Sequence, residues 1–122
     1  MHEDSELIKF FDWVRIQEKF DDRLSVIYHV ANERKTSQHH GKIFKQKGVR
    51  SGVPDVCVPI PSGMYPGLFI EFKVKPNTLS DNQKKFIKTL ISIGHLCTIA
   101  YSADEAIRIV REYLDEPSKM AH

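Results

Sequence analysis

The segment GLFIEFKVK, residues 67–75, decides the fold of this chain, because apolar residues alternate along a whole strand length. Successive side chains of a strand point to opposite faces, so every second residue here contributes to one continuous apolar face. Glu71 and Lys73 lie on the other face, beside Phe69. A carboxylate and an ammonium are costly to bury unless they are paired or used. The segment therefore predicts a strand whose second face carries either a partly exposed salt bridge or a functional pair.

A second strand-like segment, residues 55–60, precedes the first one in the chain. The connection between them, PSGMYPG, is rich in turn-forming residues, which favours an antiparallel hairpin. A hairpin centred near Met64 would place Asp55 roughly opposite Lys73, to within about two residues of register, and one pleat from Glu71. Two carboxylates and a lysine would then converge on one face of the sheet.

This predicted cluster has the composition of a magnesium site. Carboxylates on neighbouring strands are close enough to share one metal ion. Mg²⁺ prefers oxygen ligands, keeps several waters, and is often held by one or two carboxylates together with substrate phosphate. A lysine beside such an ion can orient or help deprotonate a water molecule for attack on phosphorus. Asp55, Glu71 and Lys73 thus predict phosphodiester hydrolysis.

The rest of the chain consists of alternating helix-like and strand-like segments, which predicts a single α/β domain over residues 1–122. Ser80 with Gln83, and Ser102 with Glu105, have the spacing of capping boxes at helix starts. Apolar periodicity predicts helices over residues 5–20, 37–47, 80–94 and 102–114, and strands over residues 25–30 and 95–101.

The composition, 41% hydrophobic and 28% charged, is typical of a globular domain. No apolar run approaches the roughly 20 residues that span a bilayer, and the first residues are acidic rather than those of a secretory signal. We therefore expect a cytoplasmic protein of a bacterial or phage type with no membrane partner. Cys57 and Cys97 lie in strand-like apolar runs and are expected to be reduced core residues. The histidines lack the spacing of zinc ligands.

Positive charge is concentrated in the middle of the chain. Residues 34–88 contain eleven Lys or Arg and three acidic residues, whereas both ends are acidic. Such a distribution suits a surface that binds a polyanion, although a charge run can also be a solvated face. We expect nucleic acid to contact Lys42, Lys45, Lys47, Arg50, Lys75, Lys84 and Lys88.

The order of the charged residues also resembles a known nuclease signature. Pro54-Asp55, fifteen intervening residues and Glu71-Phe72-Lys73 resemble the PD-(D/E)XK pattern. Further segments extend the likeness to the VRR-NUC branch of that superfamily, over about residues 28–114. They are Asn32-Glu33, GVRSGVPD at 48–55, FIEFK at 69–73 and LSDNQ at 79–83.

This resemblance implies a restriction-endonuclease-like core, a mixed sheet flanked by helices, and dependence on magnesium or manganese. By position, the catalytic residues would be Glu33, Asp55, Glu71, Lys73 and Gln83. The metal ligands would be Asp55, Glu71 and the Phe72 carbonyl, with Glu33 as a further candidate. Taken without the family pattern, Gln83 is explained equally well as a helix cap, whereas Glu33 is better explained as a surface residue.

The resemblance also implies an endonuclease that cuts structured DNA, such as four-way (Holliday) junctions. Two other hypotheses remain open, namely a DNA-binding module without activity and a nuclease acting on other DNA or RNA structures. The number of metal ions is open as well. Because a domain of this size offers one active site and a junction needs two symmetric cuts, we expect a homodimer.

Overall fold

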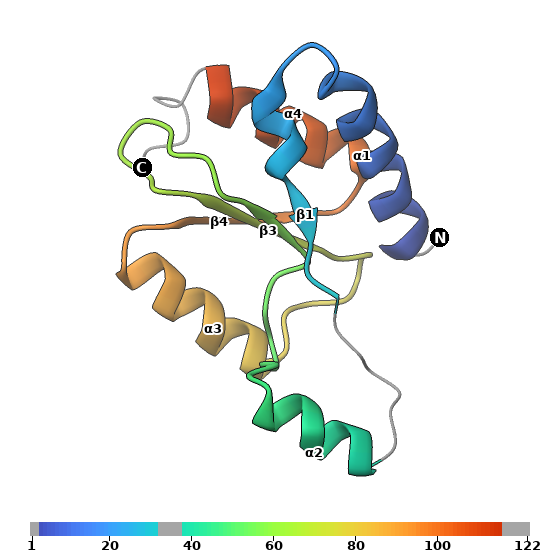
Figure 1. Ribbon diagram of the computed structural model, residues 1–122, viewed down its shortest axis with the longest axis vertical. Helices are drawn as coiled ribbons and strands as arrows, with labels where there is room; N and C mark the ends of the chain where they lie inside the picture. The colour runs from blue at the N-terminus through green and yellow to red at the C-terminus, as the bar shows by residue number, and fades with distance from the viewer. Residues whose placement is uncertain (1–2, 32–37, 116–122) are drawn as a thin grey trace.

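The computed structural model describes residues 3–31 and 38–115 of the chain (Figure 1). Helices and strands alternate along it, as the sequence predicts. In chain order they are α1 (Glu3–Gln17), the 3-10 helix η1 (Asp22–Val26), β1 (Tyr28–His29), α2 (Gln38–Gln46), β2 (Val56–Val58), β3 (Leu68–Phe72), α3 (Asp81–Ser92), β4 (Leu96–Ala100) and α4 (Ala103–Asp115).

The four strands form one mixed sheet in the order β1-β2-β3-β4. β2 and β3 are the predicted antiparallel hairpin, and β1 pairs antiparallel with β2 at the edge. β4 runs parallel to β3. Parallel neighbours need a crossover connection, and α3 provides it. The prediction of an α/β fold with a mixed sheet and flanking helices is confirmed.

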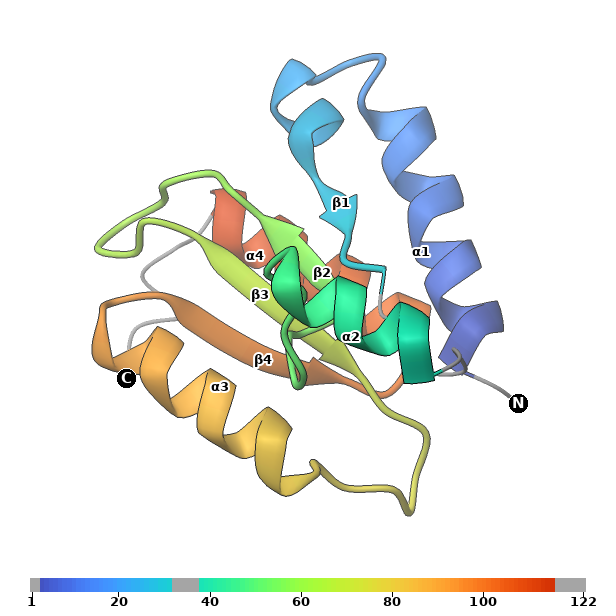
Figure 2. The same ribbon diagram turned by 60° about the horizontal axis from the view of Figure 1, so that its bottom comes forward.

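Helices cover both faces of this sheet (Figures 1 and 2). α1 and α4 pack against each other and against one face, whereas α3 packs against β4 on the other. α4 buries a stripe that runs from Ala103 to Tyr113, and the Tyr113 hydroxyl donates a 2.6 Å hydrogen bond to the Ile60 carbonyl. Full burial of each large apolar side chain stabilises such a core by about 1.5–3 kcal/mol.

The apolar face predicted for residues 67–75 is the centre of the core. Leu68, Ile70 and Phe72 are fully buried against Val56 and other core residues on the side that α1 and α4 cover. The opposite face carries Glu71 and lies on the side of α3. The alternation in the sequence therefore separates the hydrophobic core from the charged pair.

The predicted strand over residues 25–30 is largely wrong. Its first two residues belong to η1, and only Tyr28 and His29 form a strand. The Asp21 side chain caps η1 by accepting a 3.1 Å hydrogen bond from the Arg23 backbone and also binds the Arg23 guanidinium. A local cap of this kind competes with strand pairing, and here it prevails over the β-propensity of the following residues.

Among the described residues, no helix is both long and apolar enough to cross a membrane. Cys57 is buried in β2 and Cys97 is partly buried in β4, and both are free thiols. Burial raises the pKa of both thiols, that of Cys97 to about 11. Cys57 is therefore the reduced core residue that was predicted, whereas Cys97 is a protonated thiol outside the fully buried core.

Candidate active site

The register of the β2–β3 hairpin places the two carboxylates directly across from each other. Val56 pairs with Ile70, so one residue further along the ladder Asp55 comes opposite Glu71. The observed pairing differs from the predicted one, Asp55 with Lys73, by two residues, which is the margin of that prediction. Ser62 and Tyr65 bond to each other within the connection, and the centre of the β2–β3 ladder lies one residue nearer to the first strand than predicted.

Asp55 is held in place by both neighbouring strands. Its side chain is only 8% exposed, and Oδ2 accepts a 2.9 Å hydrogen bond from the Phe72 backbone N–H. Its carbonyl accepts from the Val30 N–H at 2.7 Å and lies 2.8 Å from His29 Nδ1. The carboxylate is therefore a fixed part of the sheet rather than a mobile surface group.

Glu71 is a buried carboxylate with three charged or polar neighbours. It is 1% exposed, Gln83 Nε2 donates a 2.9 Å hydrogen bond to its Oε2, and Lys73 Nζ lies 3.6 Å from the same oxygen. Burial, reinforced by the charge of Asp55 and opposed by that of Lys73, raises the pKa of Glu71 to about 7. A carboxyl poised near neutral pH inside such a cluster is characteristic of functional sites.

Lys73 lies just beyond the end of β3, where its backbone N–H donates to the Ala100 carbonyl at 3.0 Å. Its side chain is 12% exposed and its ammonium points to Glu71. A lysine this buried is kept only when a carboxylate compensates the loss of hydration. The ion pair expected on this face is therefore present, and it is buried rather than at the surface.

Gln83 forms the predicted helix cap and also contacts Glu71. At the start of α3, Ser80 Oγ accepts from the Gln83 backbone N–H and Gln83 Oε1 accepts from the Ser80 N–H, which is the complete capping box. The other end of the same amide, Nε2, donates to Glu71. The helix start thereby orients the buried carboxylate.

The turn before β2 also touches α3, an approach that was not predicted from the sequence. Gly52 has a φ of +84°, and a Cβ there would lie 2.4 Å from the Asn82 carbonyl oxygen. The neighbouring Ser51 hydroxyl accepts a 2.9 Å hydrogen bond from the Asn82 side chain. The glycine within GVRSGVPD was the available signal, because close approach of two backbones requires the absence of a side chain. This approach brings the segment that leads to Asp55 against the start of the helix that carries Gln83.

The donor atoms at this site fit a hard divalent cation. Within residues 3–31 and 38–115, no group of three or more His, Cys, Asp or Glu side chains is arranged to hold a metal. The available ligands are the carboxylates of Asp55 and Glu71 and the Phe72 carbonyl, which lies on the same side of the strand as the Phe72 N–H that contacts Asp55. Oxygen donors of this kind suit Mg²⁺, whose charge would also relieve the repulsion between the two buried carboxylates. Glu33, the further predicted ligand, lies outside the described residues.

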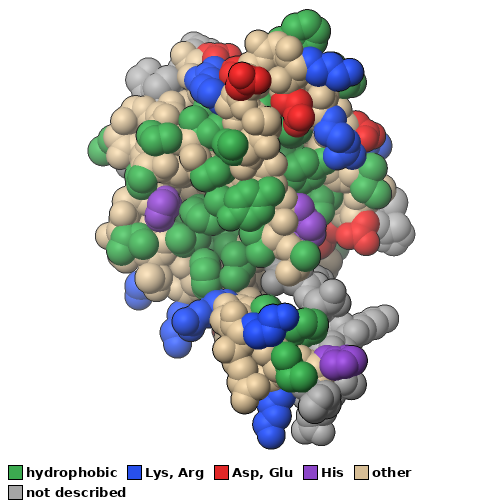
Figure 3. All heavy atoms as spheres, in the orientation of Figure 1, with side chains coloured by type: hydrophobic (Ala, Val, Ile, Leu, Met, Phe, Trp, Pro, Cys, Tyr) green, Lys and Arg blue, Asp and Glu red, His purple; other side chains and the backbone are tan. Residues whose placement is uncertain are grey.

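The residues expected to contact nucleic acid are all exposed. Lys42 and Lys45 lie on α2, Lys84 and Lys88 on α3, and the remainder on the loops beside them or after β3. Figure 3 shows Lys and Arg side chains around α2 and α3 in the lower part of the molecule; further Lys and Arg side chains lie in the upper part, together with most of the acidic side chains in this view. Two of the lysines contact aromatic rings, Lys47 that of Phe44 and Lys75 that of Tyr101.

Comparison with known proteins supports the resemblance seen in the sequence. The VRR-NUC domain family matches residues 4–104, a region that begins and ends earlier than the expected 28–114. A solved structure described as a VRR-NUC domain protein superimposes with a TM-score of 0.80 at 26% sequence identity, covering 99% of this chain and 91% of the other. A search of curated proteins found no match. The match over most of the chain, on a fold that places Pro54-Asp55 opposite Glu71-Phe72-Lys73, shows that the chain belongs to the VRR-NUC family of PD-(D/E)XK nucleases.

Proposed function

We propose that the protein is a metal-dependent endonuclease that hydrolyses phosphodiester bonds in structured or branched DNA, such as four-way junctions. The observation that carries this proposal is the buried pair formed by Asp55 and Glu71, with Lys73 Nζ 3.6 Å from Glu71 Oε2. Two buried carboxylates facing each other destabilise a fold unless a cation balances them, and one lysine cannot balance both. Family membership supports the nuclease chemistry.

Asp55, Glu71 and the Phe72 carbonyl would hold Mg²⁺ or Mn²⁺, and Glu33 is a further candidate ligand and catalytic residue. Such a cation polarises a phosphoryl oxygen and lowers the pKa of water when it is bound. The chain itself positions this site rigidly, because the Phe72 N–H holds Asp55 and Gln83 holds Glu71. Rigid placement of ligands matters because Mg²⁺ demands nearly ideal octahedral geometry.

The remaining catalytic groups act through position and charge. The Lys73 ammonium, directed by Glu71, would orient the attacking water and stabilise the negative charge that develops on the phosphoryl oxygens. Gln83 would act as a positioning residue, because it holds the Glu71 carboxylate from a helix start. The low exposure of Glu71 and Lys73 strengthens each of these electrostatic interactions.

Metal dependence is the first test of this function. We expect labelled DNA to be cleaved with Mg²⁺ or Mn²⁺, bound but barely cut with Ca²⁺, and left intact with EDTA, because Ca²⁺ coordinates more loosely. The measurement is gel analysis of a duplex, a flap, a four-way junction and a matched RNA. Full cleavage after demetallation and chelation would reject the mechanism. Tight binding with no cleavage of any substrate would instead favour a DNA-binding module, in which Asp55 only ties β2 to β3.

DNA binding should depend steeply on salt. Replacing Lys84 and Lys88 with glutamine is expected to reduce the slope of log K against log salt by roughly 0.9 for each phosphate that the protein no longer neutralises. A triple replacement of Lys42, Lys45 and Lys47 on and after α2 should have a comparable effect per phosphate. Fluorescence anisotropy between low and moderate salt measures both slopes. Unchanged slopes in both variants would place the DNA surface elsewhere on the molecule.

We further propose that the active form is an isologous homodimer, which supplies the two symmetric cuts that a junction requires. The interface should avoid the basic elements α2 and α3, because like charges oppose assembly. Exposed apolar side chains on and after α1 offer such a surface, among them Ile8, Ile16 and Phe20, of which Phe20 is 82% exposed. Light scattering should give twice the monomer mass, and nick mapping should show paired cuts on opposing strands. A monomer that cuts linear duplex as fast as junctions would contradict the dimer.

A further inference from the structure

A groove of about 520 Å³ lies between α3 and the loop that precedes β2. Its volume is within the range of sites that hold small ligands. Phe86, Leu90 and Ile93 give it an apolar surface along one side of α3, and Thr89 lies among them. Arg50 and Lys85 supply positive charge, and no acidic side chain lines the groove within the described part of the chain.

An apolar wall together with two cationic side chains favours one class of ligand. A surface that contacts only the phosphates of a duplex needs cationic side chains, and apolar side chains would contribute nothing to that contact. An unstacked nucleotide, in contrast, presents an apolar base face together with an anionic phosphate, and proteins bind it by pairing ring contacts with cations. Phe86 beside Arg50 and Lys85 offers this pairing. Lys85 was not among the residues that the sequence assigned to nucleic acid.

The groove begins at the same helix start that contacts the candidate active site. Ser51 and Asn82, which are hydrogen-bonded to each other at 2.9 Å, line one part of it. The next residue along α3, Gln83, donates to Glu71. A strand whose phosphate lies at the buried carboxylates would therefore pass close to the groove with an adjacent nucleotide.

We propose that this groove binds one unpaired nucleotide of the DNA substrate, with the base against Phe86 and Leu90 and its phosphate at Arg50 and Lys85. The inference rests on the proposed nuclease function and adds a source of substrate selectivity to it. In intact duplex the same base is stacked and paired, and unstacking it costs energy. Branched or unpaired DNA avoids that cost, so the groove favours it.

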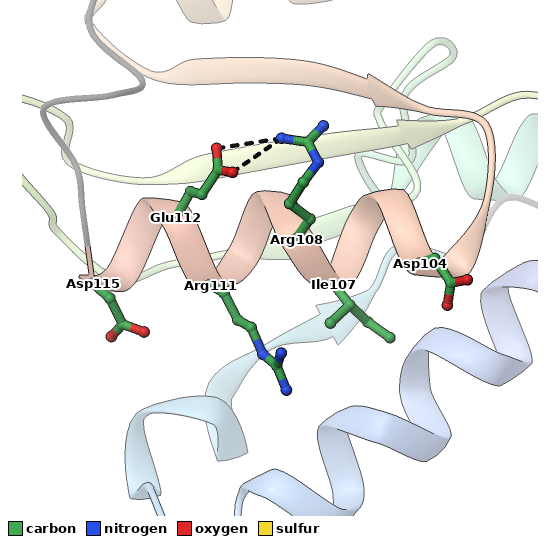
Figure 4. A pocket seen from close by; sticks show the side chains of 6 residues that line it. All are labelled: Asp104, Ile107, Arg108, Arg111, Glu112 and Asp115. Carbon is green, nitrogen blue, oxygen red and sulfur yellow. Dashed lines mark hydrogen bonds and ion pairs between the residues drawn. The ribbon is translucent and has the colours of Figure 1, made fainter.

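A second hollow, on α4, has the same volume of about 520 Å³ but a different set of lining residues (Figure 4). Three carboxylates line it, and both of its arginines already have partners, one of them within the hollow. Arg108 binds Glu112 at 3.2 Å, and Arg111 lies 5.4 Å from the centre of the Trp13 ring. Carboxylates repel phosphate, so this hollow is unsuited to DNA.

The decisive variant is Thr89→Trp, which fills the groove from an exposed position and leaves the buried core unchanged. Affinities are measured by anisotropy in Ca²⁺ for two labelled DNAs, a fully paired duplex and the same duplex with one unpaired nucleotide. We expect the wild-type protein to prefer the second DNA by about fivefold or more, as one base–aromatic contact allows. Thr89→Trp should lose this preference and retain its affinity for the paired duplex. Ile91→Trp, an exposed substitution on α3 outside the groove, is the matched control and should keep the preference.

Lys85→Ala provides a second, milder variant and should reduce the preference without reshaping the groove. Equal affinity of the wild-type protein for both DNAs, or an unchanged preference in folded Thr89→Trp, would overturn the assignment. The groove and the nuclease function are tested independently, because these binding measurements need no cleavage. Absence of Mg²⁺-dependent cutting would overturn the nuclease function instead.

Discussion

Replacing Glu71 with glutamine is expected to slow DNA cleavage by about a thousandfold or more, as removal of a member of a catalytic unit commonly does. The substitution keeps the shape of the side chain and its contact with Gln83, but it removes the charge that would bind the metal and direct Lys73. Asp55→Asn and Lys73→Ala should cause comparable losses. Combined variants should lose little more than single ones, since the three residues act together.

The measurement is single-turnover cleavage of a labelled four-way junction at saturating protein and Mg²⁺. Glu112→Gln is the matched control, because it neutralises a glutamate on α4 that contacts only Arg108 among its charged neighbours in the described structure. That variant should cleave at the wild-type rate. Circular dichroism establishes that each variant is folded. Wild-type activity in folded Glu71→Gln would rule out the proposed metal site.

The same substitution is expected to stabilise the metal-free protein at pH 8, by up to roughly 3 kcal/mol for a pKa displaced from 4.5 to about 7. Burial raises the folded-state pKa of Glu71 above its unfolded value, so the folded protein holds an additional proton between these two values. The stability contributed by protonated Glu71 is complete below about pH 4.5 and is lost as the pH rises through about 7. Glutamine has no such proton to lose.

Urea unfolding in EDTA at pH 5 and pH 8 measures this difference. The free energy of unfolding of the wild-type protein should fall between these pH values more than that of Glu71→Gln. Glu112→Gln should follow the wild-type protein. Mg²⁺ should restore stability to the wild-type protein at pH 8 and have little effect on Glu71→Gln. If the free energy of unfolding depended on pH in the same way for the wild-type protein and Glu71→Gln, burial would not raise the pKa of Glu71.

Patterns with one local cause were predictable from the sequence. The alternation in residues 67–75 predicted β3 and its two faces, and Ser80 with Gln83 predicted the start of α3. The second capping box is present in altered form. The Ser102 hydroxyl accepts from the Glu105 N–H as expected, but Glu105 Oε1 accepts from Tyr101 rather than from the cap residue itself.

Features that depend on competing contacts were not predictable. β-branched residues favoured a strand from residue 25, but the Asp21 cap produced η1 instead. Turn-forming residues predicted the hairpin but not its register, which differs from the predicted one by two residues. Asp55, Glu71 and Lys73 nevertheless lie together, because a shift of two residues keeps every side chain on its original face.

The amide of Gln83 both accepts and donates a hydrogen bond, which restricts the side chains that can replace it. Its oxygen accepts from Ser80 while its nitrogen donates to Glu71. Glutamate would preserve the helix cap but set a third negative charge against the buried pair, and lysine would keep a donor but lose the acceptor. Asparagine has both groups on a shorter stem and cannot span both partners. Mutational tolerance at this position should therefore be close to nil in a selection for activity, although a screen for helix stability alone would accept glutamate readily.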